Sequence, residues 1–552
     1  IEIAPRSLAQ VSRADVHAHD QVEIAPAPAV AFEDVTTPEA TLLDHADDFS
    51  RVRRALQGQV ETIDIEAARA LPQILRDHAW AARIFMREGR IVGVGAPGRR
   101  AIGLAVDLGT TNVVGFLLDL ETGARLASLG IENPQVAWGA DLVSRINHAA
   151  ATRKQQDELQ AAARTAINAL AHDLAQAVGL RADDVRDVAV CGNTAMQHLL
   201  LGLPVRQLGR APFVGALHDA VEVSASDIGL RLAPGAMAHV AANIGGFVGS
   251  DHVAALLATR QRWQGEGVSL VMDIGTNTEI SLIRGDEIVS ASCPSGPALE
   301  GGHISCGMRA ADGAIEVVRL DEQAPPVDAT DVTRPVEQAP PVEERASASV
   351  SKPAVHLGVI GDVEPKGLCG SGLVDAVAEL VRVGLLDSTG RFVSDDAALE
   401  LAPGLADRLT LVGQERVFVL HRPEPDTPPA ETVYLSQRDV RELQFAKAAI
   451  STGWTLLLEE LGLAHADVQQ VLLAGSFGSY LSPAAAVRIG LVPQLPTLRI
   501  VSAGNVAGEG AKMALLSLRE RAGAEALLEE VTYVELSDRP DFNDRFVEQL
   551  AF

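Results

Sequence analysis

Two short segments of the sequence place a carboxylate, a glycine and polar side chains in the same order after an apolar run. They are Asp107-Leu-Gly-Thr-Thr-Asn112 and Asp273-Ile-Gly-Thr-Asn-Thr278. Glycine lets the backbone approach a phosphate closely, while threonine hydroxyls and backbone amides donate hydrogen bonds to it. A single turn of this kind is often purely structural. Two related turns facing each other predict a site that holds nucleotide phosphates from both sides.

The predicted roles within these turns follow from side-chain chemistry. Asp107 and Asp273 are expected to be catalytic and to hold Mg²⁺ through its water molecules, because Mg²⁺ prefers carboxylate and water oxygens. The alternative is that each carboxylate only caps its turn. The residues predicted to contact phosphate are Gly109, Thr110, Thr111, Asn112, Gly275, Thr276 and Asn277. The sequence has no Gly-Lys-Ser/Thr motif, which excludes a P-loop protein.

Three further polar residues are candidates for the same site. Asp251 begins a small-residue helix and can act as the general base for an attacking water, or it can be the N-cap of that helix. Asn193 follows a strand at 185–190 and is expected to orient the γ-phosphate. Lys447 lies on a helix predicted over 440–461 and either reaches the ribose or adenine or is a solvated helix lysine.

A third glycine-rich turn follows the strand predicted at 468–473. Its residues Gly475, Ser476, Phe477 and Gly478 are suited to the sugar and adenine of a nucleotide. Phe477 either stacks on the base or belongs to the hydrophobic core.

Composition limits the class of protein. The chain has 552 residues, of which 47% are apolar and 22% charged, and its formal net charge is −27. This balance is typical of a globular enzyme with several domains, and it disfavours nucleic acid and anionic membrane as partners. The four cysteines lie far apart, which disfavours disulfides and a thiolate metal site and indicates a cytoplasmic protein with reduced thiols.

Changes in composition and in residue pattern predict how the chain is divided into domains. Residues 1–32 are expected to form an irregular linker, and residues 33–98 a small α+β domain with a helix and a hairpin. From residue 99 onwards, the unit of strand, Gly/Thr turn and hairpin occurs twice, which indicates an internal duplication. The Pro-rich segment 321–352 contains EQAPPV twice and is expected to be a disordered insertion. A Pro-rich docking peptide is the alternative.

The ordered set of motifs resembles the actin, sugar-kinase and Hsp70 (ASKHA) superfamily. The segments that carry this resemblance are phosphate 1 at 107–112, connect 1 at 245–256, phosphate 2 at 273–278, adenosine at 472–478 and connect 2 at 503–515. The resemblance implies an α/β ATPase with two lobes, each built on an RNase H-like sheet. Lobe I is expected over 99–260 and lobe II over 261–500, with a closing helix at 503–518.

Four longer strings resemble the reductive activators of corrinoid-dependent methyltransferase systems. They are NPQVAWGADLVSRI (133–146), GNTAMQHLLLG (192–202), SGPALEGGHISCGMRA (295–310) and GLCGSGLVDAVAEL (367–380). The resemblance implies that ATP binding and hydrolysis drive electron transfer to a corrinoid-binding methyl-carrier protein, returning inactive Co(II) to Co(I). It also implies an electron donor as a second partner and a homodimer formed through the small α+β domain.

Members of that family usually carry a [2Fe–2S] domain at the N-terminus. The four cysteines here lack the plant-type C-x₄-C-x₂-C spacing. We therefore expect the cluster only on an N-terminal domain that this sequence does not contain.

Two other functions are compatible with an ASKHA fold. A small-molecule kinase would need a base beside an acceptor hydroxyl, and a nucleotide-gated scaffold would not turn over ATP in response to a partner. The four long strings favour the corrinoid activator over both.

Overall fold

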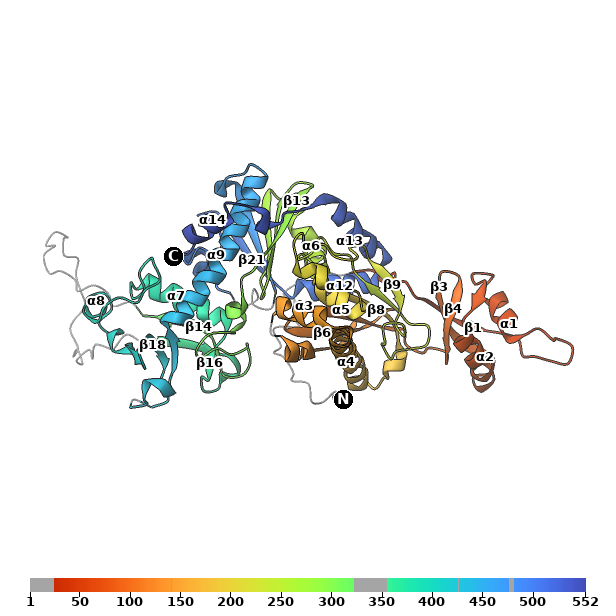
Figure 1. Ribbon diagram of the computed structural model, residues 1–552. Helices are drawn as coiled ribbons and strands as arrows, with labels where there is room; N and C mark the ends of the chain where they lie inside the picture. Colours follow the sequence, from red (N-terminus) through yellow and green to blue (C-terminus); the bar gives the residue numbers. More distant parts are fainter. Residues whose placement is uncertain (1–23, 140, 322–354, 425, 476–480) are drawn as a thin grey trace, which may run out of the picture. The chain divides into compact units, whose positions relative to one another are not determined.

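The computed structural model describes residues 24–139, 141–321, 355–424, 426–475 and 481–552 (Figure 1). The chain forms two compact units. Unit 1 comprises Ile1–Cys293, Gly453–Ser479 and Leu495–Arg539, and unit 2 comprises Pro294–Thr452, Tyr480–Gln494 and Pro540–Phe552. Apart from Asp321, the predicted disordered insertion at 321–352 lies outside the described residues.

The first six-stranded sheet of unit 1 carries the first Gly/Thr turn. Its strands, in spatial order, are β7 (Arg125–Glu132), β6 (Asn112–Asp119), β5 (Ile102–Leu108), β8 (Val185–Gly192), β10 (Met237–Val240) and β9 (Val221–Ser224). The central strand β5 is apolar on both faces because both faces are covered. Leu104 packs towards Leu170 of α4 (Arg153–Ala177), whereas Ala105 packs towards Leu515 of α12 (Val506–Leu516).

The second six-stranded sheet repeats the arrangement of the first. Its strands, in spatial order, are β21 (Arg499–Gly504), β20 (Val468–Ala474), β11 (Val268–Asp273), β12 (Thr278–Arg284), β13 (Glu287–Cys293) and β22 (Val531–Tyr533). Strand β11 pairs in parallel with β20 and antiparallel with β12, just as β5 pairs with β8 and β6. The duplicated unit inferred from the sequence is therefore present in the fold.

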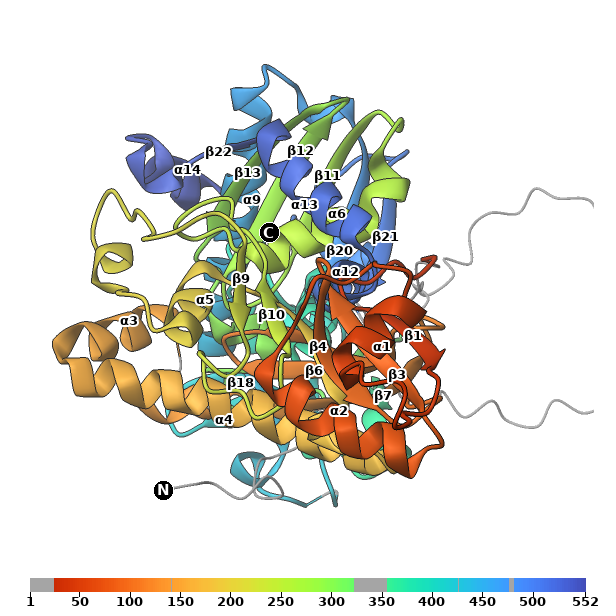
Figure 2. The same ribbon diagram turned by 90° about the vertical axis from the view of Figure 1, so that its right-hand side faces the viewer.

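Two helices rich in small residues cross closely between these sheets. They are α6 (Ser250–Trp263) and α12, which lie side by side in both ribbon views (Figures 1 and 2). A Cβ atom at Gly510 of α12 would lie 2.2 Å from the carbonyl oxygen of Ala254 of α6. The small residues are thus needed for the helix crossing. Unit 1 also contains α3 (Leu142–Ala151), α5 (Thr194–Leu201), α13 (Leu518–Glu530) and the last part of α9 (Gln437–Glu460).

Residues 31–95 form a separate small sheet with its own core. The sheet has the order β1 (Ala31–Thr36), β3 (Ala81–Arg87), β4 (Arg90–Gly95) and β2 (Thr62–Ile63), and it packs with α1 (Asp48–Ala55) and α2 (Ile65–Asp77). Arg87 at the end of β3 forms an ion pair with the fully buried Asp187 of β8. This buried ion pair fixes the small domain to the first large sheet.

Unit 2 contains two three-stranded sheets. They are formed by β15 (Val355–Val359), β14 (Ala314–Leu320) and β16 (Gly367–Leu368), and by β17 (Leu409–Val412), β18 (Glu415–His421) and β19 (Val433–Ser436). Its helices are α7 (Gly370–Arg382), α8 (Asp395–Leu401), α11 (Pro483–Arg488), α14 (Phe542–Glu548) and the first part of α9 (Gln437–Glu460).

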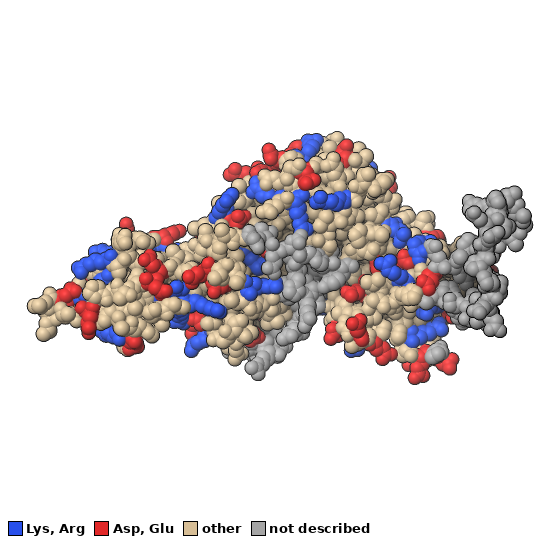
Figure 3. All heavy atoms as spheres, turned by 180° about the vertical axis from the view of Figure 1, so that it is seen from behind, with Lys and Arg blue, Asp and Glu red and all other residues tan. Residues whose placement is uncertain are grey.

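Two features of the described residues concern the surroundings of the protein, namely the composition of the helices and the charge of the surface. Within the described part of the chain, no helix has both the length and the apolar composition needed to cross a membrane. On the face drawn in Figure 3, basic and acidic side chains alternate over the described surface.

The close crossing predicts a steric effect at Gly510. We expect Gly510→Ala to lower the free energy of unfolding by about 1–3 kcal/mol, because its Cβ atom would collide with backbone atoms of Ala254 that cannot rotate away. Urea unfolding measures the change. Gly523→Ala on α13 is the matched control, since its nearest neighbour is a leucine methyl at 3.7 Å. An unchanged Gly510→Ala variant would show that α6 and α12 are not this tightly packed.

Candidate active site

Three carboxylates from separate elements of unit 1 lie close enough to influence one another. Asp107 is near the end of β5, Asp273 ends β11, and Asp251 lies in the first turn of α6. Burial, and then the negative charges of Asp251 and Asp107, raise the pKa of Asp273 to about 8. The structure therefore brings together the three residues that the sequence predicts to be catalytic.

Asp251 lies in the first turn of α6, and its carboxylate can take up a proton because its pKa is raised. Burial raises its pKa to about 6, although the amide of His252 donates a hydrogen bond of 2.9 Å to its Oδ1 atom. The alternative that Asp251 is the N-cap of this helix is wrong, because Gly249 occupies that position. A Cβ atom at Gly249 would lie 2.3 Å from Cα of Asn193, so a residue with a capping side chain does not fit there.

The first Gly/Thr turn is tied to two asparagines. A Cβ atom at Gly109 would be 2.8 Å from the carbonyl oxygen of Asn112, which explains the glycine. Asn133 donates through Nδ2 to the Gly109 carbonyl at 2.8 Å, and Asn193 donates through Nδ2 to Oγ1 of Thr110 at 2.8 Å. Asn193 also caps α5, accepting a hydrogen bond from the amide of Met196. Asn193 therefore lies beside the first Gly/Thr turn, and Thr111 and Asn112 lie half-buried in the turn itself.

The second and third glycine-rich turns meet at Asp273. Gly275, Thr276 and Asn277 form the half-buried turn between β11 and β12. Gly475, which follows β20, has φ of 87°, and a Cβ atom there would lie 2.9 Å from Oδ1 of Asp273. The other predicted adenosine-binding residues, Ser476, Phe477 and Gly478, lie outside the described residues.

Lys447 belongs to the part of α9 that lies in unit 2. It is 3% exposed, so the alternative of a solvated helix lysine is wrong. Its amino group donates hydrogen bonds of 2.6 Å to the carbonyl oxygens of Gln549 and Ala551, and burial lowers its pKa to about 8. Its contact with a nucleotide stays a prediction.

A fourth carboxylate, missed in the sequence, lies in the same cluster. Glu279 of β12 is directly opposite Asp273 in the sheet register and is 7% exposed. Burial, followed by the charges of Asp251 and Asp273, raises its pKa well above the usual range, and Ser292 donates a hydrogen bond of 3.4 Å to it. The only sequence signal was an acidic residue near the start of the strand predicted after the second Gly/Thr turn.

The cluster fits a magnesium–nucleotide complex. Several carboxylates in a partly buried place repel one another, and a cation would relieve that repulsion. Across the described ranges, no three His, Cys, Asp or Glu side chains are arranged as direct ligands of one metal ion. Carboxylates such as Asp107 and Asp273 would suit Mg²⁺, because this ion keeps several water molecules and takes oxygens from one or two carboxylates and from phosphates.

The neighbouring Cys191 and His252 remain neutral. Burial, then the negative charge of Asp107, raises the pKa of the Cys191 thiol well above its usual range, and burial lowers the pKa of His252 to about 3. Cys191, Cys293 and Cys369 are buried free thiols.

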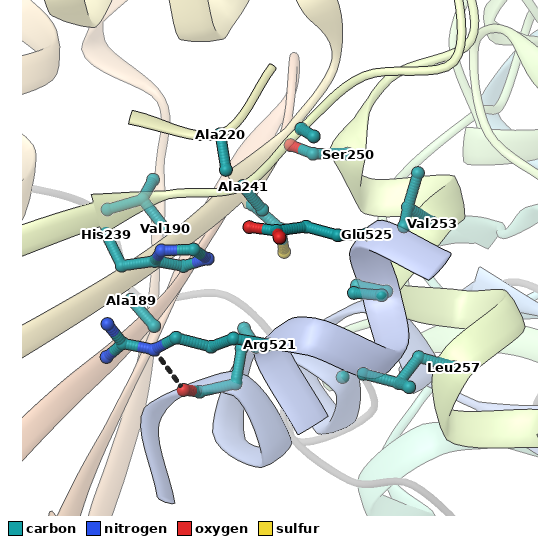
Figure 4. Close-up of a pocket in the computed structure, with 17 residues that line it drawn as sticks. Ala189, Val190, Ala220, His239, Ala241, Ser250, Val253, Leu257, Arg521 and Glu525 are labelled. Carbon is teal, nitrogen blue, oxygen red and sulfur yellow. Dashed lines mark hydrogen bonds between the residues drawn. The ribbon is translucent and has the colours of Figure 1, made fainter. Parts of the chain in front are cut away.

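A small cavity lies beside the crossing of α6 and α12. Its lining is mostly apolar, unlike the carboxylate cluster. It is about 20 Å³, roughly the space of one water molecule, and is bordered by β8, α6, α12 and α13. Figure 4 shows its lining, which includes Val190, Ser250, Val253 and Leu257. The cavity is too small for a nucleotide.

The duplicated sheets, the two facing turns and the crossing helices define a nucleotide-binding protein of the ASKHA class. Comparison with family models agrees. A model described as the C-terminal domain of RACo, the ASKHA domain, matches residues 267–552. Models of the RACo middle region and the RACo linker region match residues 102–262 and 19–101.

Individual relatives are similar over most of their length. The chain is 32% identical over 450 residues to the corrinoid activation enzyme RamQ of Eubacterium limosum, covering 82% of this chain and 70% of that protein. It is 26% identical over 464 residues to the Co(II) methylated amine-specific corrinoid protein reductase of Methanosarcina barkeri, covering 82% and 77%. A solved structure of a reductive activator for corrinoid, iron–sulfur protein has a TM-score of 0.80 and 28% identity, covering 99% of this chain and 83% of that one.

The chain belongs to the RACo family of reductive activators of corrinoid proteins. The predicted fold class and the resemblance inferred from the four long strings are both confirmed.

The raised pKa of Asp273 predicts how stability depends on pH. Between about pH 4 and 8 the folded protein retains a proton that the unfolded chain has lost, so stability falls as pH rises through this range. We expect the metal-free wild type to lose about 1–2 kcal/mol more than Asp273→Asn between pH 6 and 8. Urea unfolding in EDTA at both pH values measures this difference. Equal pH dependence in the two proteins would contradict the clustering of the carboxylates.

Proposed function

We propose that this protein is an ATP-dependent reductive activator of a corrinoid-binding methyl-carrier protein. ATP is bound and hydrolysed at the carboxylate cluster of unit 1, and this drives one-electron reduction of Co(II) corrinoid to Co(I). The observation that carries the proposal is the convergence of Asp107, Asp251 and Asp273 in a member of the RACo family. The relatives named as a corrinoid activation enzyme and a Co(II) corrinoid protein reductase support the choice of substrate.

The phosphate-facing residues divide into two roles. Asp107 and Asp273 would hold Mg²⁺ through water, and the bound ion would offset the negative charge of the phosphates. The turns at Gly109 and Gly275 bring backbone amides close to the phosphates, and Thr110 is held in place by Asn193. These groups bind and orient ATP before its reaction.

Asp251 is proposed as the general base. With a pKa of about 6 it is mostly ionised at neutral pH, yet it can accept a proton from the attacking water in the reaction. Its Oδ1 atom accepts a hydrogen bond from the backbone amide of His252. This hydrogen bond fixes the carboxylate and leaves Oδ2 to receive the proton. Water then adds to the γ-phosphate, and ADP and phosphate are the products.

The electron is a separate reactant. Each cobalt takes up one electron, which a low-potential one-electron donor must supply as a second partner. Among the described residues, no three His, Cys, Asp or Glu side chains are placed to bind one metal ion directly. A [2Fe–2S] centre outside these residues is our proposed carrier. The four-stranded small domain is our candidate for the homodimer contact.

The proposal predicts loss of ATP turnover in variants of the metal-holding pair. Asp107→Asn and Asp273→Asn should each lower kcat by about 100-fold or more, because the amide cannot hold a hydrated cation at the phosphates. Phosphate release measures turnover, and the absorbance of Co(I) corrinoid measures activation in the presence of an electron donor. Asp157→Asn, in an exposed ion pair on α4, is the matched control.

Three results would overturn this function. They are wild-type turnover in both variants, transfer of the γ-phosphate to a small-molecule acceptor rather than water, and Co(I) formation that is equally fast without ATP. The second result would indicate a kinase.

A further inference from the structure

Asn505 connects the proposed ATP site to the helix that crosses between the two sheets. It follows β21 and is the N-cap of α12, where its Oδ1 atom accepts a hydrogen bond of 2.7 Å from the amide of Gly508. Its Nδ2 atom donates a hydrogen bond of 3.2 Å to Oδ2 of Asp107. One side chain, 7% exposed, thus serves both the helix and the carboxylate.

Helix α12 cannot shift freely with respect to the site. All eleven of its residues are buried. A Cβ atom at Gly508 would lie 2.6 Å from the ring of Phe116 of β6, and Gly510 is in backbone contact with Ala254 of α6. Because a close-packed interior resists small displacements, the position of α12 fixes the position of Asn505.

The far end of α12 is also fixed. Ala27 donates a backbone hydrogen bond of 2.8 Å to the carbonyl of Leu516 and accepts one of 3.0 Å from the amide of Leu518. Arg521 of α13 donates through Nε to the carbonyl of Ala514 at 2.7 Å, the interaction drawn as a dashed line in Figure 4. The same arginine pairs with Asp187 of β8 at 2.7 Å. The helix therefore connects the Asp107 carboxylate to the segment at Ala27 that precedes β1 of the small domain.

We infer that Asn505 is a positioning residue for ATP hydrolysis, which holds the Asp107 carboxylate in its working orientation and makes that orientation depend on the placement of α12. The inference rests on the proposed function, because it assumes that Asp107 serves the nucleotide. It adds a residue outside the phosphate and adenosine turns, at the N-terminus of a helix whose far end contacts Ala27 and Arg521.

The chemistry of the position favours asparagine over the other good N-cap residues. Aspartate would cap the helix equally well, but it would place a second anion against Asp107. Serine would also cap the helix, but it is too short to occupy both positions. Only a side chain with an acceptor at one atom and a donor at the other satisfies both Gly508 and Asp107.

The test compares Asn505→Ser and Asn505→Asp, which both keep an N-cap acceptor. We expect kcat for ATP hydrolysis to fall about 10-fold in each variant, and further in Asn505→Asp, because a hydrogen bond to a charged group is lost. The dissociation constant of a fluorescent ATP analogue in Asn505→Ser should stay within about threefold of the wild type, since the phosphate turns are intact. Thr152→Ala, which removes the N-cap of α4 without touching the site, is the matched control and should retain wild-type kcat.

The outcomes separate the two proposals. A wild type that does not hydrolyse ATP would refute the proposed function. A wild type that does, with wild-type kcat in Asn505→Ser, would refute only the role of Asn505. An equal fall in kcat for Thr152→Ala, or equal losses in kcat and affinity for Asn505→Ser, would also refute it, because a general loss of stability would then account for the effect. If Asn505→Asp does not fold, Asn505→Ser decides.

Discussion

Repulsion between partly buried carboxylates is the constraint on which the rest of this structure depends. Asp107, Asp251 and Asp273 come from three different elements, and Glu279 lies opposite Asp273. Burial and mutual charge raise the pKa of Asp273 to about 8, so the protein alone does not stabilise the fully ionised cluster. The protein must hold these groups together against their repulsion, and a bound cation would make the arrangement favourable. Carboxylates whose pKa values are raised by burial and by neighbouring negative charges are common at functional sites.

The duplicated sheet is well suited to impose this arrangement. In each sheet, a buried strand has a carboxylate at or next to its last residue, Asp107 in β5 and Asp273 in β11. The strands paired on both sides prevent that strand end from moving. The crossing of α6 and α12 adds Asp251 from one helix and Asn505 from the other. Because the crossing relies on backbone contact at Gly510, it couples the two helices more closely than larger side chains would allow.

Local patterns in the sequence were sufficient to predict the two strands and the Gly/Thr turns that follow them, because a buried strand followed by Gly and Thr is encoded within about eight residues. The roles of Asn505 and Glu279 were not visible, since each depends on a partner from a different part of the chain or on its depth in the sheet. The interpretation of Asp251 as an N-cap was wrong because the close approach of Asn193 to Gly249 is a tertiary effect. The two small sheets of unit 2 were also missed, since their strands are short and separated by irregular segments.

The most direct test of the central claim is to locate the metal. Crystals grown with Mn²⁺ and a non-hydrolysable ATP analogue would give an anomalous peak for the ion. The account predicts one peak beside the phosphates, within reach of Asp107 and Asp273 through water, with Asp251 facing the γ-phosphate. A nucleotide bound away from these carboxylates, or an ion held by other residues, would contradict it.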